Sequence, residues 1–283
     1  MSALAQFLLR GRTQAIVVAV LAALLPLLFW FSAAAISLVT LRKGVANGGL
    51  VLVWALVPAI MWSRQGDYSP LIVILGAYIL AIILRSTVSW QRVIQAALLL
   101  AVIAGLVQQQ LNGDMLAQVV EGVRKLMLQT SPLKSTALVG ESQWLLQAIL
   151  GVFNTLHFVM MLSSVLLARW WQSCLFNPGG LQQEFHQLRL SPIFVVSLIA
   201  MTAIAINSGG ELIRWVPIMV APLVVAGLAL AHGSVAKRRL GKSWLVALYG
   251  ATFILGPYAI TMLVIFAAID TLVDIRKKIP ASQ

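Results

Sequence analysis

The sequence predicts an all-α protein, a polytopic bundle of membrane helices with about six full crossings, flanked by two hairpins or kinked helices that each contain a proline. Of the 283 residues, 60% are hydrophobic and only 10% are charged, whereas about 25% of the residues of a soluble domain are charged. Apolar runs recur along the chain without a long polar linker, and basic residues cluster at their ends. We therefore expect a single integral membrane domain over residues 1–283, with the lipid bilayer as its surroundings.

Eight apolar runs are long enough to form helical membrane segments, for which about 20 apolar residues are needed, or fewer where a helix is short or broken. Six of them are expected to cross once each: 44–62, 70–84, 93–107, 144–168, 192–207 and 215–231. The first run, 15–40, and the last, 244–269, are too long for one simple crossing and contain Pro26 and Pro257. Because proline removes a backbone donor and clashes with the preceding turn, each predicts a hairpin of two short helices. One long kinked helix is the alternative.

The charges set the expected orientation. If both long runs return to their starting side, one side of the membrane receives 15 of the 20 basic residues, and the other receives five of the eight acidic residues. Lys and Arg in short loops favour the cytoplasm. We therefore expect a protein of the bacterial cytoplasmic (inner) membrane, with both termini in the cytoplasm. Because the cations end apolar runs and do not line a soluble face, nucleic acid is not an expected partner.

Two connecting segments have an amphipathic pattern. Residues 115–128 place apolar side chains on one helical face and polar ones opposite, which predicts a helix in the outer interface. Residues 177–190 begin with the turn sequence Asn-Pro-Gly-Gly and continue with Leu181, Phe185 and Leu188 at helical spacing. This second pattern predicts an amphipathic segment on the cytoplasmic side.

No catalytic constellation stands out, so we do not expect an enzyme. The sequence has no glycine-rich phosphate loop, no HExxH, no GxSxG and no cysteine pair, and Cys174 is its single cysteine. With only three histidines a multi-histidine metal site is not expected either. We therefore expect neither a metal nor another cofactor.

Polar residues at membrane depth are the best candidates for ligand binding, because they usually face a bundle interior or a cavity. Asn154 and His157 lie three residues apart in a long apolar run and share a helix face. They predict a ligand or proton contact, with interhelical hydrogen bonding as the alternative. Asn207 and Glu211 flank a short outward loop containing Gly209 and Gly210, which either helps to capture a ligand or simply joins two helices.

Three features are candidate partner contacts. Ala15, Ala19 and Ala23 repeat at every fourth position and predict a docking stripe for another membrane subunit, with internal packing as the alternative. Asp270 lies near the end of the last apolar run, where it predicts either a docking contact or pairing with nearby cations. The remaining candidates lie in the cytoplasmic amphipathic segment and are Asn177, Gly179, Glu184 and Phe185.

Landmarks over nearly the whole chain resemble the YybS-like family of uncharacterised bacterial integral membrane proteins. They are Leu41-Arg42-Lys43-Gly44, Trp171, Phe176-Asn177-Pro178-Gly179-Gly180, Glu184-Phe185, Leu188-Arg189-Leu190, Asp270 and Asp274-Ile275-Arg276. That family is distantly similar to the substrate-binding S-components of energy-coupling-factor transporters, in which six helices form a ligand pocket open to the outside. In these proteins an alanine-rich stripe on the first helix docks a coupling subunit. Ten expected membrane segments exceed six helices, so the similarity implies a class of mechanism and no substrate.

Together these features predict a transport-related protein that binds a small hydrophobic or amphipathic solute and works with a transmembrane coupling subunit and a separate ATPase. The alternative is a membrane scaffold or assembly factor whose cytoplasmic segment contacts a cytoplasmic or envelope partner.

Overall fold

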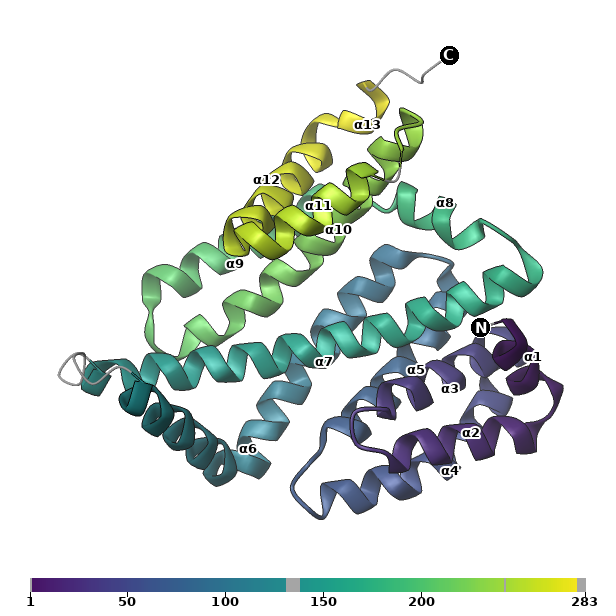
Figure 1. Cartoon of the computed structure of the whole chain (residues 1–283), viewed down its shortest axis with the longest axis horizontal. Helices are drawn as coiled ribbons and strands as arrows, with labels where there is room; N and C mark the ends of the chain where they lie inside the picture. Colours follow the sequence, from purple (N-terminus) through teal and green to yellow (C-terminus); the bar gives the residue numbers. More distant parts are fainter. Residues whose placement is uncertain (1, 131–137, 242, 279–283) are drawn as a thin grey trace. The chain divides into compact units, whose positions relative to one another are not determined.

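A computed structural model describes residues 2–130, 138–241 and 243–278. Nearly all of these residues are helical and none forms a strand, so the predicted all-α class is confirmed. The elements in chain order are α1 (Ser2–Arg10), α2 (Arg12–Leu24), α3 (Phe29–Lys43), α4 (Val45–Ser63), α5 (Ser69–Thr87), α6 (Trp90–Thr130), α7 (Leu138–Phe176), α8 (Gly180–Gln187), α9 (Pro192–Ser208), the 3-10 helix η2 (Gly210–Trp215), α10 (Val216–Lys237), α11 (Ser243–Leu255), α12 (Pro257–Val273) and α13 (Ile275–Lys278) (Figure 1).

Five helical stretches are long and apolar enough to cross a membrane: Val45–Ser63, Ser69–Thr87, Trp90–Leu111, Leu146–Phe176 and Gly210–Lys237. Two bent pairs add further candidates, α1 with α2 at 119° and α8 with α9 at 64°. The six runs expected to cross once all fall in helices, namely α4, α5, α6, α7, α9 and α10. The predicted polytopic helical membrane bundle is therefore confirmed.

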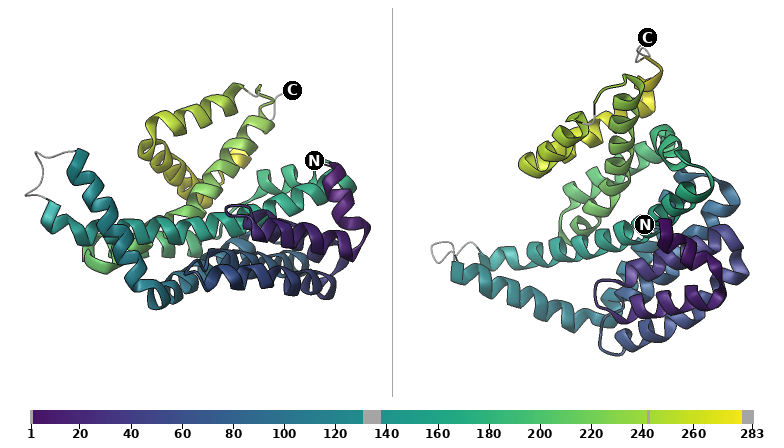
Figure 2. Two further views of the ribbon diagram at one scale, coloured as in Figure 1. Left: turned by 60° about the horizontal axis from the view of Figure 1, so that its bottom comes forward. Right: turned by 45° about the vertical axis from the view of Figure 1, so that its right-hand side comes forward.

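Both overlong runs are broken where the sequence predicted. Pro26 lies in the turn after α2, and Leu25 before it is extended, with ψ 128°, because the proline ring disfavours helical backbone in the preceding residue. At the second break Gly256 adopts φ 51°, a conformation that suits glycine, and Pro257 begins α12, where its missing N–H is not needed. Figures 1 and 2 show the chain reversing at both points, and each break joins two helices in contact.

The described helices group into two compact units. Unit 1 contains residues 1–177 and 204–218, and unit 2 contains residues 178–203 and 219–283. The chain therefore passes from one unit to the other within α9 and again within α10. Each unit is described by itself below.

Helix α3 forms the core of unit 1 and contacts α2, α4, α5 and α7. It is buried almost all round, at Phe29 and at every residue from 32 to 41. Small side chains let its neighbours approach closely: a Cβ at Gly48 of α4 would lie 3.0 Å from the Cα of Thr40. Two of its buried hydroxyls donate to backbone carbonyls, Ser37 to Ala77 and Thr40 to Ile36. These bonds satisfy polar groups that would otherwise be costly to bury.

Unit 2 contains α8, α11, α12, α13 and the larger parts of α9 and α10. Helix α10 approaches its neighbours through glycines. A Cβ at Gly227 would lie 2.4 Å from the carbonyl oxygen of Leu263 on α12, and one at Gly233 would lie 2.9 Å from that of His186 on α8. Both glycines therefore allow close backbone contacts that alanine would disturb.

Three elements differ from the sequence prediction in extent. Helix α1, which precedes the first apolar run, was not predicted. Residues 115–128 are helical as predicted, but they belong to α6, which continues to Thr130. The membrane stretch of α7, Leu146–Phe176, has 31 residues and is therefore roughly 46 Å long, more than the 30 Å or so of a hydrocarbon core. A helix of this length tilts or extends beyond the core.

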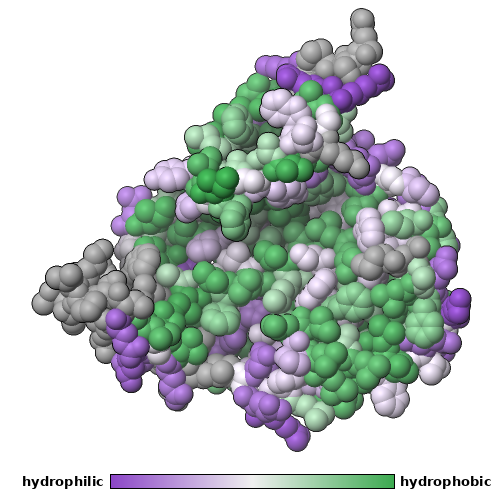
Figure 3. All heavy atoms as spheres, viewed as in Figure 1, coloured by the Kyte–Doolittle hydropathy of each residue, from purple (hydrophilic) through white to green (hydrophobic). Residues whose placement is uncertain are grey.

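Apolar side chains dominate the exposed helix surfaces (Figure 3). On α11 no residue is buried, and Trp244, Phe253 and Ile254 are all strongly exposed. Contiguous exposed apolar surface of this extent is unfavourable in water and suits contact with lipid tails.

Candidate functional site

A cavity of about 410 Å³ lies in unit 1 among four segments of the chain. It is bounded by the α2–α3 turn, the α4–α5 connection, α6 and α7. Its lining residues are Leu27, Phe29, Gly66, Asp67, Ser69, Gln108, Val119, Phe153, Leu156, His157 and Met160. The volume is within the range of small-molecule pockets, and a mostly apolar lining with a few polar groups is typical of them.

His157 provides the buried polar group of this cavity. The residue is only 2% exposed, although its ring borders the cavity. Gln108 of α6 is also buried, and Asp67 lines the same cavity. Polar side chains buried in an apolar wall can fix the orientation of a bound molecule. His157 therefore brings an imidazole to an otherwise largely apolar wall.

The connection between α4 and α5 positions Asp67. Gly66 turns the chain with φ 91°, and the carboxylate of Asp67 then accepts the backbone N–H of Ser69 at 2.9 Å. This contact satisfies one of the free N–H groups at the start of α5. The same hydrogen bond fixes the carboxylate at the edge of the cavity.

Asn154 has a different environment from His157, although both lie on α7. It is buried, but it does not line the cavity. Its amide lies against Gly105 of α6, where a Cβ would come within 2.3 Å of Oδ1. The geometry thus favours an interhelical packing role for Asn154 and a cavity role for His157.

The loop that contains Gly209 and Gly210 is held against α6 and α7 by Arg214. Its guanidinium donates to the side chain of Gln109 at 2.6 Å and lies 3.5 Å from the carboxylate of Glu211. Gly151 of α7 allows the approach, because a Cβ there would lie 2.7 Å from the carbonyl oxygen of Arg214. Asn207 and Glu211 are exposed and do not line the cavity. The ligand role predicted for these two residues gains no support from their positions.

The alanine stripe of α2 points into unit 1. Ala15, Ala19 and Ala23 are each at most 1% exposed, and α2 contacts α3 and α4. The indole of Trp62 on α4 also donates to the carbonyl of Ala23 at 3.1 Å. These positions therefore form no exposed docking stripe, and the internal-packing alternative accounts for them.

In unit 2, Asp270 is bound by two arginines and is only 3% exposed. Its Oδ2 lies 3.2 Å from Nε of Arg276 and 3.7 Å from Nε of Arg189. Arg189 also donates to the backbone carbonyl of Asp270 at 2.7 Å. Burial between two guanidinium groups favours the predicted pairing role and leaves little of the carboxylate for a partner.

Arg276 links three parts of unit 2. Its guanidinium donates to the carbonyl of His186, in the last turn of α8, and to the carbonyl of Leu188, directly after α8. Its own carbonyl accepts the ammonium group of Lys237 on α10 at 2.6 Å. These contacts connect α8, α10 and the α12–α13 junction. The ends of three helices are thus held together by one arginine.

Asp274 completes this network at the surface. Its carboxylate lies 2.8 Å from Arg189 and 3.2 Å from Lys277. Burial raises the pKa of Asp274, but the hydrogen bond from Lys277 and the charge of Arg189 outweigh it. The net pKa therefore lies below its ordinary value.

The predicted cytoplasmic segment is partly helical, as α8. Asn177 and Gly179 are exposed, and Gly179 adopts φ 83° just before the helix begins. Phe185 packs edge-on against the ring of His232, with 5.5 Å between the ring centroids, and Glu184 is half-buried. Of the predicted docking residues, Asn177 and Gly179 are thus the more accessible.

Sequence reasoning identified His157 and missed other polar residues of the cavity, Asp67 and Gln108 among them. The available signal was weak: one acid after an apolar run, and a glutamine directly after another. Among the described residues, no group of three or more His, Cys, Asp or Glu side chains is close enough to hold a metal ion. No family model, curated protein or solved structure matches the chain.

Proposed function

We propose that this chain is a transport-related membrane protein that binds a small hydrophobic or amphipathic solute in the cavity around His157. The observation that carries the proposal is the 410 Å³ cavity itself, with a mostly apolar lining and a buried histidine in its wall. An apolar body would fill the lining, and a polar head would reach the imidazole.

The polar residues suggest which head group is accepted. Among the lining residues that the structure describes, Asp67 has the one charged side chain, and Gln108 and Ser69 add neutral groups. An anionic head would meet the carboxylate at short range in surroundings of low dielectric constant, which is unfavourable. A neutral or cationic amphipathic molecule is therefore the expected solute.

The expected topology supports capture from outside. Gly66, Asp67 and Ser69 belong to the connection that the charge distribution assigns to the non-cytoplasmic side of a bacterial inner membrane. Because the sequence has no phosphate-binding loop, energy for transport would come from a separate ATPase, through a transmembrane coupling subunit. The alanine stripe of α2 is buried, so such a subunit would dock on another surface.

The test is whether a small molecule co-purifies with the chain through this cavity. The full-length protein is extracted directly from bacterial membranes into lipid nanodiscs, and its small molecules are identified by mass spectrometry. Two variants alter the cavity: His157→Leu removes the polar contact, and Leu156→Trp fills space. Because one buried hydrogen bond is lost, His157→Leu should lower retention of the molecule by about tenfold.

Asn154→Ala is the matched control, since Asn154 is a buried polar residue on the same helix that does not line the cavity. Retention in the control together with loss in both cavity variants would support the proposal. The proposal fails if no molecule is enriched over nanodiscs carrying an unrelated membrane protein. It also fails if both cavity variants retain the molecule, and recovery of a stable protein partner without any solute would favour the scaffold alternative.

A further inference from the structure

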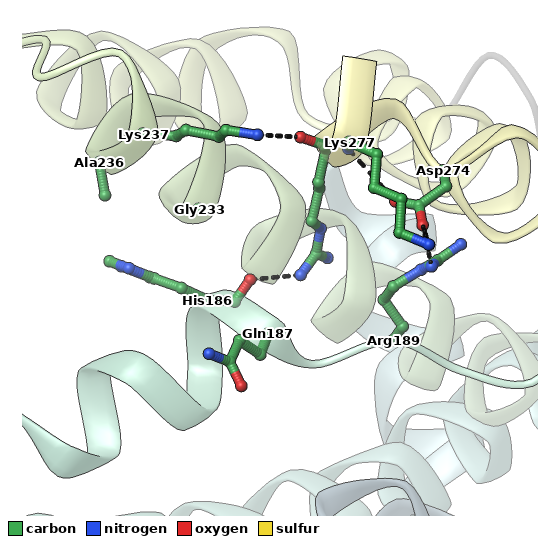
Figure 4. Close-up of a pocket in the computed structure, with 9 residues that line it drawn as sticks. His186, Gln187, Arg189, Gly233, Ala236, Lys237, Asp274 and Lys277 are labelled. Carbon is green, nitrogen blue, oxygen red and sulfur yellow. Dashed lines mark hydrogen bonds and ion pairs between the residues drawn. The ribbon is translucent and has the colours of Figure 1, made fainter. Parts of the chain in front are cut away.

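A second cavity, of about 590 Å³, lies wholly within unit 2 (Figure 4). It is bounded by the end of α8 with the following linker, the last turns of α10 and the junction of α12 with α13. Its lining residues are His186, Gln187, Arg189, Gly233, Ala236, Lys237, Asp274, Arg276 and Lys277.

The charge of this cavity is positive. Arg189, Lys237, Arg276 and Lys277 supply four cations, and Asp274 supplies one carboxylate. Asp270, which lies behind the lining and binds both arginines, supplies a second. Four positive charges against two negative ones leave a net charge of +2 around the cavity, counting His186 as neutral. Such a site attracts anions and disfavours cations.

The arginines and the lysines of this cavity have different roles. The guanidinium groups of Arg189 and Arg276 are occupied by backbone carbonyls and by the two carboxylates, so they fix the shape of the site. An ammonium group has three N–H donors. Among the described residues, Lys237 uses its ammonium group on the carbonyl of Arg276 and Lys277 on Asp274. Both lysines therefore keep donors for a bound anion.

Apart from Lys237, the wall formed by α10 has only small side chains. Gly233 and Ala236 lie one turn apart there, and Figure 4 shows them beside Lys237 and opposite His186. A group of several oxygen atoms thus has room next to the ammonium group of Lys237. A phosphate, with its tetrahedral oxygens, has the chemistry that lysine ammonium groups bind as point charges.

Apolar surface adjoins the cavity. Ile269, Leu272 and Val273 on the last turns of α12 are exposed, and Asp274 follows them directly. Lys237 ends the apolar helix α10, and Arg276 and Lys277 in α13 closely follow the apolar helix α12, which places them at the depth of lipid headgroups when these helices span a bilayer. A molecule with its phosphate among the lysines can therefore lay acyl chains along α12.

We propose that this cavity binds the phosphate headgroup of an anionic phospholipid. Phosphate is the shared chemistry of a lipid headgroup and a free phosphate ion, and the exposed apolar end of α12 favours the lipid. Basic pockets beside membrane helices on the cytoplasmic side are suited to anionic headgroups. The site is independent of the solute cavity in unit 1.

The test is binding of short-chain phosphatidylglycerol to the purified full-length protein in a neutral detergent, followed by native mass spectrometry. Short-chain phosphatidylcholine serves as the neutral comparison, and inorganic phosphate as the competitor. The double variant Lys237→Gln/Lys277→Gln should bind phosphatidylglycerol up to about 30-fold more weakly, since each basic residue contributes about a factor of five. Ala236→Leu keeps every charge, fills the cavity and should weaken binding as well.

Arg238→Gln/Arg239→Gln is the matched control. Like the test variant it removes two positive charges, but from residues directly after α10 that do not line the cavity. It should weaken binding by no more than about threefold, as exposed charges are screened by salt. Equal losses in control and test variants would overturn the site in favour of general surface charge. Unchanged binding in Ala236→Leu would also overturn it, and displacement of the lipid by equimolar inorganic phosphate would overturn the assignment to a lipid.

Discussion

The role of Asp270 yields the sharpest quantitative prediction, because its carboxylate is buried between two arginines. Asp270→Asn keeps the shape of the side chain but removes its charge. Removing one partner of a buried ion pair costs about 3–5 kcal/mol. The lower end applies here, because the side chain of Arg189 is 34% exposed and also binds Asp274 at 2.8 Å. We expect unit 2 to lose about 3 kcal/mol of stability.

Hydrogen–deuterium exchange measures this loss locally. Peptides covering α12 and α13 and the linker after α8 should exchange about a hundredfold faster, since every 1.4 kcal/mol is a factor of ten. Peptides from α3 and α4 in unit 1 serve as the internal reference.

Asp274→Asn is the comparison for this experiment, because Asp274 belongs to the same network at the surface. Its loss of protection should be clearly smaller, since surface ion pairs contribute little. The reasoning is refuted if Asp270→Asn leaves exchange of α12 unchanged. It is also refuted if Asp274→Asn accelerates exchange as much as Asp270→Asn does.

Three further predictions follow from single contacts. Gly105→Ala should lower the stability of unit 1 by about 1–3 kcal/mol, because the new Cβ meets Asn154. Gly122→Ala on the same helix has open space around the new Cβ and should not be destabilising. Thermal unfolding in detergent distinguishes the two variants. The stability advantage of wild type over Asp274→Asn should be constant above about pH 5 and shrink below about pH 4, because a lowered carboxylate pKa adds stability that is lost on protonation. Pulsed hydrogen exchange at each pH measures this stability advantage. An advantage that grew as the pH fell would contradict the prediction. A cysteine at Leu27, in a cysteine-free background, should react with an impermeant maleimide added outside spheroplasts, and labelling only after lysis would contradict the proposed orientation.

The two chain reversals were predictable because their causes are local. Pro26 forces Leu25 out of helical backbone, and Gly256 with Pro257 supplies a left-handed residue followed by a residue suited to the start of a helix. Proline alone did not decide the matter, however. Pro58 lies inside α4 and Pro222 inside α10, and both helices continue through them. In a long helix the neighbouring turns tolerate one missing hydrogen bond.

The candidate site was only half predictable. The spacing of Asn154 and His157 indicated a shared helix face, but it could not show that one side chain meets Gly105 and the other a cavity. The alanines of α2 pose the same problem, because a stripe of small residues suits an internal helix contact as well as a partner. What lies opposite a helix face is set by residues far away in the sequence.

By itself, the sequence determined the helical class, the positions of the apolar segments and the placement of basic residues at their ends. These properties depend on hydrophobicity and on local backbone preference, which are written along the chain. Only the tertiary structure decided that α3 is the core of unit 1, that Asp270 is enclosed by Arg189 and Arg276, and that two cavities of different charge exist. Those features arise from contacts between distant helices, and periodicity within one helix carries no information about its neighbours.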